Sequence, residues 1–280
     1  MLDKFYTKTN IAELCYTELM SILPTKTYTF LEPSAGCGRF IDILRKHNHN
    51  FIAYDILPER EDIIQKDFLN DSIEINEEVI VLGNPPFGKK SSLAVQFINK
   101  CFEYSKIVGF ILPIQFRKYS AQNKIREDAI LLRDITLPEN SFTNGDKDYS
   151  LRCCFQIWCL PDFEEINTFQ NLRTSKPITS HPDFEMFQYN CTKEALKFFD
   201  YDWDFCVYRQ GFLDYSKKFY NKEELNIKNQ YIFFKASNKR VLNNLLSLNF
   251  EELSKKNIRI PGFGKADIVE VYTSKYESLI

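Results

Sequence analysis

The stretch VLGNPPFGKK, residues 81–90, is the feature from which the fold can be worked out. The apolar run EVIVLGN (78–84) leads into it and has the unbroken hydrophobic character of a strand that is buried on both faces of a sheet. This strand must end at Pro85 and Pro86, because proline fixes φ and has no N–H to donate. One proline is enough to end a strand. The added amide of Asn84 and the ring of Phe87 therefore indicate a site at the strand's end.

Apolar strands alternate with amphipathic helices on both sides of this strand. Asn10 and Glu13 have the spacing of a capping box at the start of the first helix. Alternation of this kind predicts an α/β fold with a parallel sheet covered on both faces, and ligands bind such sheets at the carboxyl ends of the strands. The predicted strands cover residues 27–32, 51–55, 61–67, 107–113, 129–138 and 150–160, and the predicted helices cover residues 10–22, 40–47, 92–105 and 117–128.

The character of the sequence changes after this alternating region. Residues 1–162 are predicted to form the catalytic domain, and the polar, proline-containing residues 163–183 are predicted to be a linker. Residues 184–280 are aromatic-rich over 198–234 and are predicted to form a small C-terminal α+β domain that contacts nucleic acid. Most of the aromatic side chains in so small a domain are expected in its core.

Composition limits the possible partners and the compartment. The 280 residues carry a formal net charge of −2, so nucleic acid would have to be bound by a local basic patch. Eight cysteines without a CxxC pair, and three histidines expected at the surface, predict reduced core thiols, no metal site and a cytoplasmic location. The longest apolar run, residues 107–114, is too short to cross a bilayer, and the N-terminus does not resemble a signal peptide, so no membrane partner is expected.

A glycine turn and two acidic residues follow the first strands. Gly36 and Gly38 stand between a strand and a helix, where the backbone can approach a ligand closely. Asp55 ends the next strand, where a carboxylate can accept both hydroxyls of a ribose, and Asp67 with Phe68 can take the edge and face of an adenine. Each feature alone also fits an ordinary turn or cap. Together, without the glycine spacing of dinucleotide or phosphate sites, they favour S-adenosylmethionine.

These residues resemble the class I adenine-N6 methyltransferases of the restriction–modification type. FLEPSAGCGRF (30–40) looks like their first cofactor motif, AYDILP (53–58) and QKDFLN (65–70) like the second and third, and NPPF (84–87) is similar to their catalytic motif. The segments 5–14, 110–116 and 137–158 also resemble parts of the family in the same order. The resemblance implies a Rossmann-like seven-stranded class I methyltransferase sheet. It places the cofactor at Tyr6, Thr7, Glu32, Pro33, Ser34, Ala35, Gly36, Gly38, Phe40, Asp55, Ile56, Asp67, Phe68 and Asn84.

The chemistry explains why the strand ends in NPPF. The side-chain oxygen of Asn84 and the carbonyl of Pro85 can accept both hydrogens of an exocyclic amino group, which directs the nitrogen lone pair toward a methyl donor. Pro86 keeps the turn rigid, and Phe87 can stack on a flipped base. Glutamine-N5 and guanine-N2 methyltransferases use similar tetrapeptides, so the motif alone does not identify the nitrogen.

The segment after the motif is locally basic. Residues 85–130 contain eight lysines and arginines against three acidic residues. Lys89, Lys90, Arg117 and Lys118 are expected to contact phosphates, and Phe142 to supply a second stacking face. DNA is therefore the predicted substrate, with base flipping. Structured RNA remains an alternative, as does a subunit that binds cofactor or DNA and needs a partner for target recognition or activity.

Overall fold

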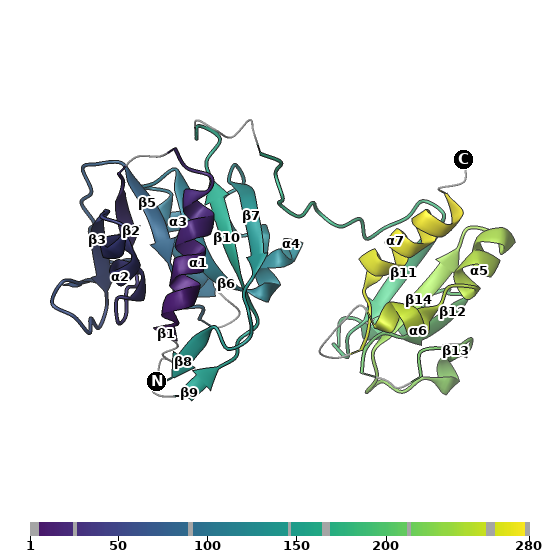
Figure 1. The fold of residues 1–280 in the computed structure, drawn as a ribbon. Helices are drawn as coiled ribbons and strands as arrows, with labels where there is room; N and C mark the ends of the chain where they lie inside the picture. Colours follow the sequence, from purple (N-terminus) through teal and green to yellow (C-terminus); the bar gives the residue numbers. More distant parts are fainter. Residues whose placement is uncertain are drawn as a thin grey trace. The chain divides into compact units, whose positions relative to one another are not determined.

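The computed structural model describes residues 6–24, 27–88, 92–144, 147–163, 169–211, 214–255 and 261–277. The chain divides into two compact units, Met1–Ser175 and Lys176–Ile280. In Figure 1 the first unit runs from purple to teal-green and the second from green to yellow. Within the residues that are described, no helix combines the length and the hydropathy that a membrane span requires.

The first unit is built on a seven-stranded sheet with the order β4-β3-β2-β5-β6-β10-β7. β2 to β6 are parallel, and β10 is antiparallel to both β6 and β7. The strand order reverses between β2 and β5, which is where doubly wound sheets bind ligands. This topology confirms the predicted Rossmann-like class I methyltransferase fold. The strands are β2 (Thr29–Glu32), β3 (Asn50–Asp55), β4 (Ile64–Gln65), β5 (Val79–Gly83), β6 (Ile107–Pro113), β7 (Ile130–Thr136) and β10 (Cys153–Cys159).

Helices cover both faces of this sheet, as the apolar run at 78–84 predicts. In β5, Ile80 and Leu82 point into a core shared with α1 (Thr9–Met20) and α2 (Arg39–Lys46). Val79 and Val81 point into the opposite core, which includes α3 (Ser92–Cys101). Figure 1 shows α1 lying across one face of the sheet. Successive residues of one strand therefore fill two cores, which explains why the strand has no polar side.

Three local predictions differ from the structure. The strand expected at 61–67 is only the two-residue β4, and the helix expected at 117–128 is a 3₁₀ turn (Ile114–Arg117) followed by the single-turn α4 (Tyr119–Gln122). The capping box is also wrong, because α1 starts at Thr9 and its N-cap residue is Lys8. Glu13 instead binds Lys46, which ends α2, at 3.0 Å, and the next residue, His47, at 2.7 Å.

A small second sheet links the N-terminal segment to the loop before β10. It contains β1 (Tyr6–Thr7), β8 (Phe142–Asn144) and β9 (Lys147–Tyr149), with Thr7 opposite Phe142. The backbone N–H of Lys8 also donates to the carbonyl of Ser141 at 3.1 Å. This pairing fixes Thr7 close to the carboxyl edge of the large sheet.

The second unit is a small α+β domain, as predicted. Its four-stranded antiparallel sheet has the order β11-β14-β12-β13. The helices pack on one face around Phe205, Phe234 and Phe250, and a second aromatic cluster around Tyr231 and Phe233 fills the other face. Most of its aromatic side chains are thus core residues. The elements are β11 (Phe184–Tyr189), β12 (Phe205–Tyr208), β13 (Lys218–Phe219), β14 (Tyr231–Ala236), α5 (Lys239–Leu246), α6 (Phe250–Ser254) and α7 (Lys265–Tyr276), with 3₁₀ turns at Leu196–Asp200 and Lys222–Glu224.

The division between the units lies inside the segment 163–183 that the sequence predicts as a linker. Residues 169–180 form no helix or strand. Leu172, Arg173 and Thr174 nevertheless form hydrogen bonds with the first unit. The first part of this segment therefore belongs structurally to the first unit.

Candidate active site

Polar side chains from three strand ends meet at the carboxyl edge of the large sheet. Glu32 ends β2, Asp55 ends β3, and Asn84 follows β5. The N–H of Gly36 donates to Asp55 Oδ2 at 2.8 Å, and the hydroxyl of Ser34 donates to the carbonyl of Asn84 at 3.3 Å. The first, second and catalytic motifs, which are far apart in sequence, are therefore joined at the switch point of the sheet.

The glycine turn is held in shape by an arginine that the sequence did not indicate. Gly36 and Gly38 have φ values of +53° and +79°, in the left-handed region. The guanidinium of Arg60 donates to the carbonyl of Gly38 at 3.2 Å and forms ion pairs with Asp42 at 2.6 Å and Asp62 at 2.7 Å. Hydrogen bonds that Arg60 donates to Asp62 and then to Asp42 raise its pKa above the ordinary value. Arg60 lies in a run of charges in which no pattern marks its partners.

Gly38→Ala is expected to destabilise the protein by about 1–2 kcal/mol, because a side chain at a left-handed φ is strained. The new Cβ would also lie 2.6 Å from Nη1 of Arg60, whose guanidinium is already fixed by two carboxylates. Urea unfolding measures the loss. Cys37→Ala, between the two glycines, is the matched control and should change stability by less than about 0.5 kcal/mol. Equal stabilities for the two variants would contradict the prediction.

Asp55 fixes the turn and still has acceptor capacity. Its Oδ2 accepts from Gly36 and its Oδ1 accepts from the N–H of Leu57, both at 2.8 Å. A carboxylate oxygen has a further lone pair after one such bond. Beside it, Ile56 is 57% exposed, which is unusual for isoleucine. The end of β3 thus offers an acid and an apolar surface next to each other.

The amide of Asn84 is satisfied on one side only. Its Nδ2 donates to the hydroxyl of Thr7 at 3.2 Å, and Thr7 is buried. Its Oδ1 is buried and has no hydrogen-bond partner among the residues that the structure describes. A buried acceptor without a donor costs free energy, so such atoms in a folded protein call for a functional explanation. The Asn84 oxygen is thus a buried acceptor whose hydrogen bond is still to be made.

Glu32 is the second buried acceptor of this edge. The residue is 2% exposed, and its Oε2 has no partner in the described part of the chain. Its pKa is raised well above the ordinary range, chiefly by burial and then by the negative charge of Asp55, whereas Arg60 acts weakly in the opposite direction. Gly83 lies beside it, where a Cβ would be in van der Waals contact with Cγ of Glu32 at 3.4 Å. A cationic ligand would satisfy this carboxyl group.

The remaining predicted cofactor residues support the turn in different ways. The hydroxyl of Tyr6 donates to Glu59, and its ring lies 3.6 Å from the position of a Cβ on Gly36. Pro33, Ala35 and Phe40 are buried, with the Ala35 N–H donating to the carbonyl of Tyr54 at 2.9 Å. Pro85 is buried, while Pro86 and Phe87 are partly exposed.

Two predicted ring contacts are buried, and a predicted acid already accepts hydrogen bonds within the protein. Asp67 accepts from Leu69 and from the side chain of Asn70, and this last bond is the main cause of its lowered pKa. Phe68 is 2% exposed and stacks on Phe97, with ring centroids 5.7 Å apart. Phe142 is completely buried in the core beside α1. Neither ring presents a face to a ligand, because both fill space between the sheet and its helices.

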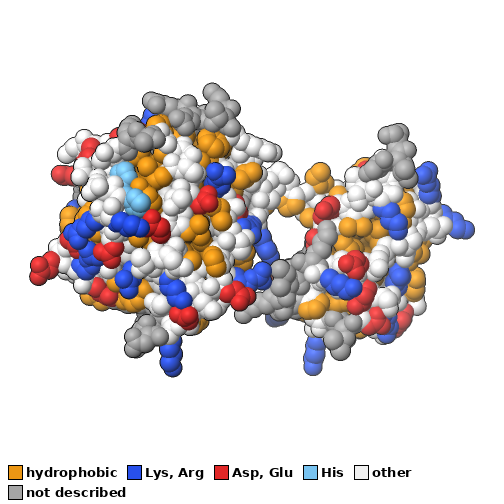
Figure 2. Space-filling model, in the orientation of Figure 1, with side chains coloured by type: hydrophobic (Ala, Val, Ile, Leu, Met, Phe, Trp, Pro, Cys, Tyr) orange, Lys and Arg blue, Asp and Glu red, His pale blue; other side chains and the backbone are white. Residues whose placement is uncertain are grey.

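The predicted phosphate contacts also separate into two kinds. Arg117 donates to Asp134 from Nε and Nη2, at 2.9 and 2.6 Å, and to Thr136 at 2.8 Å. Most of its donors are therefore used internally. Lys118 is exposed and has no ion pair among the described residues, and Lys89 and Lys90 lie outside those residues. Figure 2 shows basic and acidic side chains interspersed on the visible face of each unit.

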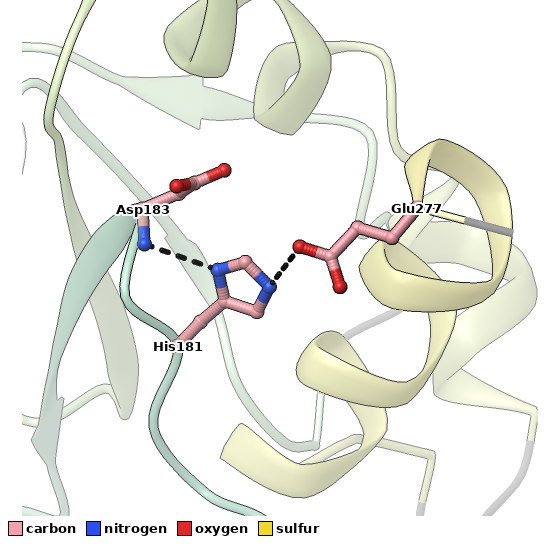
Figure 3. A group of neighbouring side chains, drawn as sticks. All are labelled: His181, Asp183 and Glu277. Carbon is pink, nitrogen blue, oxygen red and sulfur yellow. Dashed lines mark hydrogen bonds and ion pairs between the residues drawn. The ribbon is translucent and has the colours of Figure 1, made fainter. Parts of the chain in front are cut away.

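A separate cluster in the second unit joins His181, Asp183 and Glu277 (Figure 3). The side chain of His181 is 4% exposed, so the expectation of a surface histidine is wrong. Its Nδ1 accepts from the N–H of Asp183 at 3.2 Å, and its Nε2 donates to Glu277 at 2.9 Å. A metal bound at Nε2 would require the proton on Nδ1, where it would face another N–H donor. The hydrogen bonds thus favour a structural connection between the start of β11 and the end of α7.

Comparisons with known proteins provide no closer assignment than the fold. No family model matches the chain, and no curated protein matches it. Three solved structures cover 56–57% of this chain: a proposed RNA methyltransferase from Pyrococcus horikoshii, a proposed class I S-adenosylmethionine-dependent methyltransferase from Listeria monocytogenes, and a modification subunit of a proposed type I restriction enzyme from Vibrio vulnificus. Their identities are 16%, 16% and 12%, and their TM-scores are 0.42, 0.44 and 0.43.

The match spans 87% of the first of these chains but only 62% and 44% of the other two, which is less than two thirds of their length. The strand order of the large sheet, with β10 antiparallel between β6 and β7, is what gives this chain the class I methyltransferase fold.

Proposed function

We propose that this protein transfers a methyl group from S-adenosylmethionine to the N6 amino group of an adenine in DNA. The observation that carries the proposal is the Asn84 amide, with its donor side bound to Thr7 and its buried oxygen without a partner. Oxygen acceptors fixed in this way bind an amino group rather than a carbonyl or a phosphate.

The residues at the sheet edge fit the cofactor. Glu32, with an unpaired buried oxygen, suits the cationic amino-acid part, and the glycine turn at Gly36 provides close backbone approach. Asp55 and the exposed Ile56 suit the ribose and the adenine. When bound, S-adenosylmethionine supplies a methyl group made electrophilic by its sulfonium.

The protein's own groups prepare the acceptor nitrogen. Asn84 Oδ1 and the Pro85 carbonyl accept its two hydrogens, so that the lone pair is no longer delocalised into the ring and points at the methyl carbon. The new N–CH₃ bond forms as the S–CH₃ bond breaks, with the bonding pair remaining on sulfur. The nitrogen then releases one proton to water. Phe87, partly exposed beside the motif, offers a face on which a flipped base can stack.

The test is transfer of labelled methyl to unmethylated duplex DNA, single-stranded DNA, total RNA and a protein extract, with identification of the methylated product. N6-methyladenine in DNA is the expected result. Label in RNA would change the substrate while keeping the site chemistry, and label on glutamine or guanine would overturn the identity of the accepted nitrogen. Cofactor binding without transfer to any of these would indicate that a partner subunit is required.

Lys118→Ala is expected to weaken DNA binding and to reduce the slope of log K against log salt by about one, because one phosphate contact is lost. Lys118 is the suitable choice because its ammonium is exposed, whereas Arg117 is bound to Asp134. Fluorescence anisotropy at several salt concentrations measures the slope. Lys46→Ala, at an exposed lysine that ends α2 and pairs with Glu13, is the control. An unchanged slope for Lys118→Ala would remove this residue from the interface.

A further inference from the structure

The segment between β6 and β7 is irregular and lies next to the candidate site. It starts at the carboxyl end of β6, the neighbour of the strand that Asn84 follows. Its only helices are the 3₁₀ turn and the single-turn α4, and it carries the exposed Lys118. Turns within the segment bond some of its carbonyls, those of Tyr119, Ala121 and Gln122 among them. A helix of one turn is marginal on its own, so the segment depends on contacts from outside it.

One side chain from a distant part of the sequence adds such contacts. The guanidinium of Arg173 donates to five backbone carbonyls of the segment and lies over the ring of Trp158, 5.7 Å from its centroid. Its Nη1 donates to Arg126, Glu127 and Ala129 at 2.9, 3.0 and 2.8 Å, and its Nη2 donates to Gln122 and Ile125 at 2.9 and 3.0 Å.

The residues beside Arg173 extend this attachment. The N–H of Leu172 donates to the carbonyl of Leu131 on β7 at 2.8 Å. Thr174 donates from its N–H to the side chain of Gln122 at 2.7 Å and from its hydroxyl to the carbonyl of Arg117 at 2.9 Å. Residues 172–174 are therefore bonded to the segment both before Lys118, at Arg117, and after it, from Gln122 onward.

On the basis of the function proposed above, we propose that Arg173 is a positioning residue for the nucleic-acid substrate, acting through the backbone of residues 117–129. Without its guanidinium, five carbonyl groups lose a charged donor at once. Residues 117–129 then move more freely, and Lys118 is no longer held in one place on the segment that follows β6. Ordering the lysine on binding then costs conformational entropy.

The loss of Arg173 should leave cofactor binding unchanged, because the residues proposed to bind the cofactor lie elsewhere on the sheet. Glu32 ends β2, Gly36 lies in the turn between β2 and α2, and Asp55 ends β3, and both strands are on the other side of β5 from β6. None of the hydrogen bonds of Arg173 reaches them. Arg173→Ala should thus raise KM for nucleic acid while the Kd for S-adenosylmethionine stays unchanged.

The experiment compares wild type, Arg173→Ala, Arg173→Lys and Arg126→Ala in the full chain. Arg126 is the matched control, because it lies in the same segment and its guanidinium pairs with the nearby Asp128 and lies over the ring of Phe102. Arg173→Ala is expected to raise KM for DNA about fivefold, the loss expected when one phosphate contact is weakened. Hydrogen exchange should accelerate at residues 117–129. Arg173→Lys, with three donors in place of a planar fork, should restore only part of the affinity.

Rescue distinguishes positioning from general destabilisation. Millimolar guanidinium chloride should lower the KM of Arg173→Ala toward the wild-type value, and equal sodium chloride should not. An unchanged KM in Arg173→Ala would overturn the inference. So would a variant in which cofactor affinity falls, KM rises, and guanidinium reverses neither change. Wild-type protein that methylates no nucleic acid would overturn the proposed function for this chain acting alone, and this role with it. If the wild type is active, a failed prediction for Arg173→Ala concerns the role of Arg173 alone.

Discussion

Asn84→Ala is expected to lower the single-turnover rate of methyl transfer by about 10²- to 10³-fold, the loss typical of removing one preorganised polar group from an active site. The variant should still bind S-adenosylmethionine, because Glu32 and Asp55 come from other strands. The reason for so large an effect is that the Asn84 oxygen is already buried and oriented before substrate arrives. No free energy is therefore needed to orient this oxygen during the reaction. Rapid-quench measurement with labelled cofactor gives the rate directly.

Thr7→Val is the informative companion to this variant. It removes the hydroxyl that accepts from Asn84 Nδ2 at 3.2 Å and keeps the side chain's shape. The rate should fall by about tenfold, which is the effect of losing one hydrogen bond that orients a catalytic group. A Thr7→Val rate equal to that of wild type would show that Asn84 does not need this partner. An Asn84→Ala rate within a few fold of wild type would exclude Asn84 from the chemistry.

The parts of the fold that were predictable are those encoded by local patterns. The apolar run at 78–84 indicates a strand buried on both faces, and Ile80 and Val81 do pack into opposite cores. The glycine turn follows its strand as expected, because left-handed φ values such as that of Gly38 strongly favour glycine. Such features depend on the residues themselves and their immediate neighbours, so they can be predicted without the three-dimensional structure.

The parts that were not predictable are contacts between residues far apart in the sequence. Arg60 holds the glycine turn 22 residues away, and Arg173 reaches a carbonyl 51 residues away. A lone arginine in a charged or polar stretch gives no sign of its partner. Similarly, Phe68 and Phe142 have the sequence positions expected of ligand contacts, but they are buried because the cores need their volume. Spacing fixes where a residue lies along the chain, whereas packing decides which way its ring points.

Glu32→Gln is expected to weaken S-adenosylmethionine binding by about 10- to 100-fold, since a hydrogen bond to a charged group is lost. The same variant should be more stable than wild type near neutral pH. Burial, and then the charge of Asp55, raises the pKa of Glu32 well above its ordinary value of 4.5. Between that value and the raised pKa, the folded protein holds a proton that the unfolded chain has released. Stability is therefore lost as pH rises through this window.

The two effects of Glu32→Gln have one cause and opposite signs, which makes them a stringent test. The charged groups that bear on Glu32 are Asp55, Arg60 and Asp42, and they are unchanged in the variant. Urea unfolding at pH 5 and pH 8 should show a loss of stability with pH in wild type that is smaller in Glu32→Gln. Calorimetry should show cofactor affinity that rises with pH over the same window only in wild type, because ionising Glu32 becomes easier. Glu139→Gln, at an exposed position, should change neither quantity. A variant with wild-type pH dependence and wild-type affinity would mean that the buried carboxyl group serves neither stability nor the ligand.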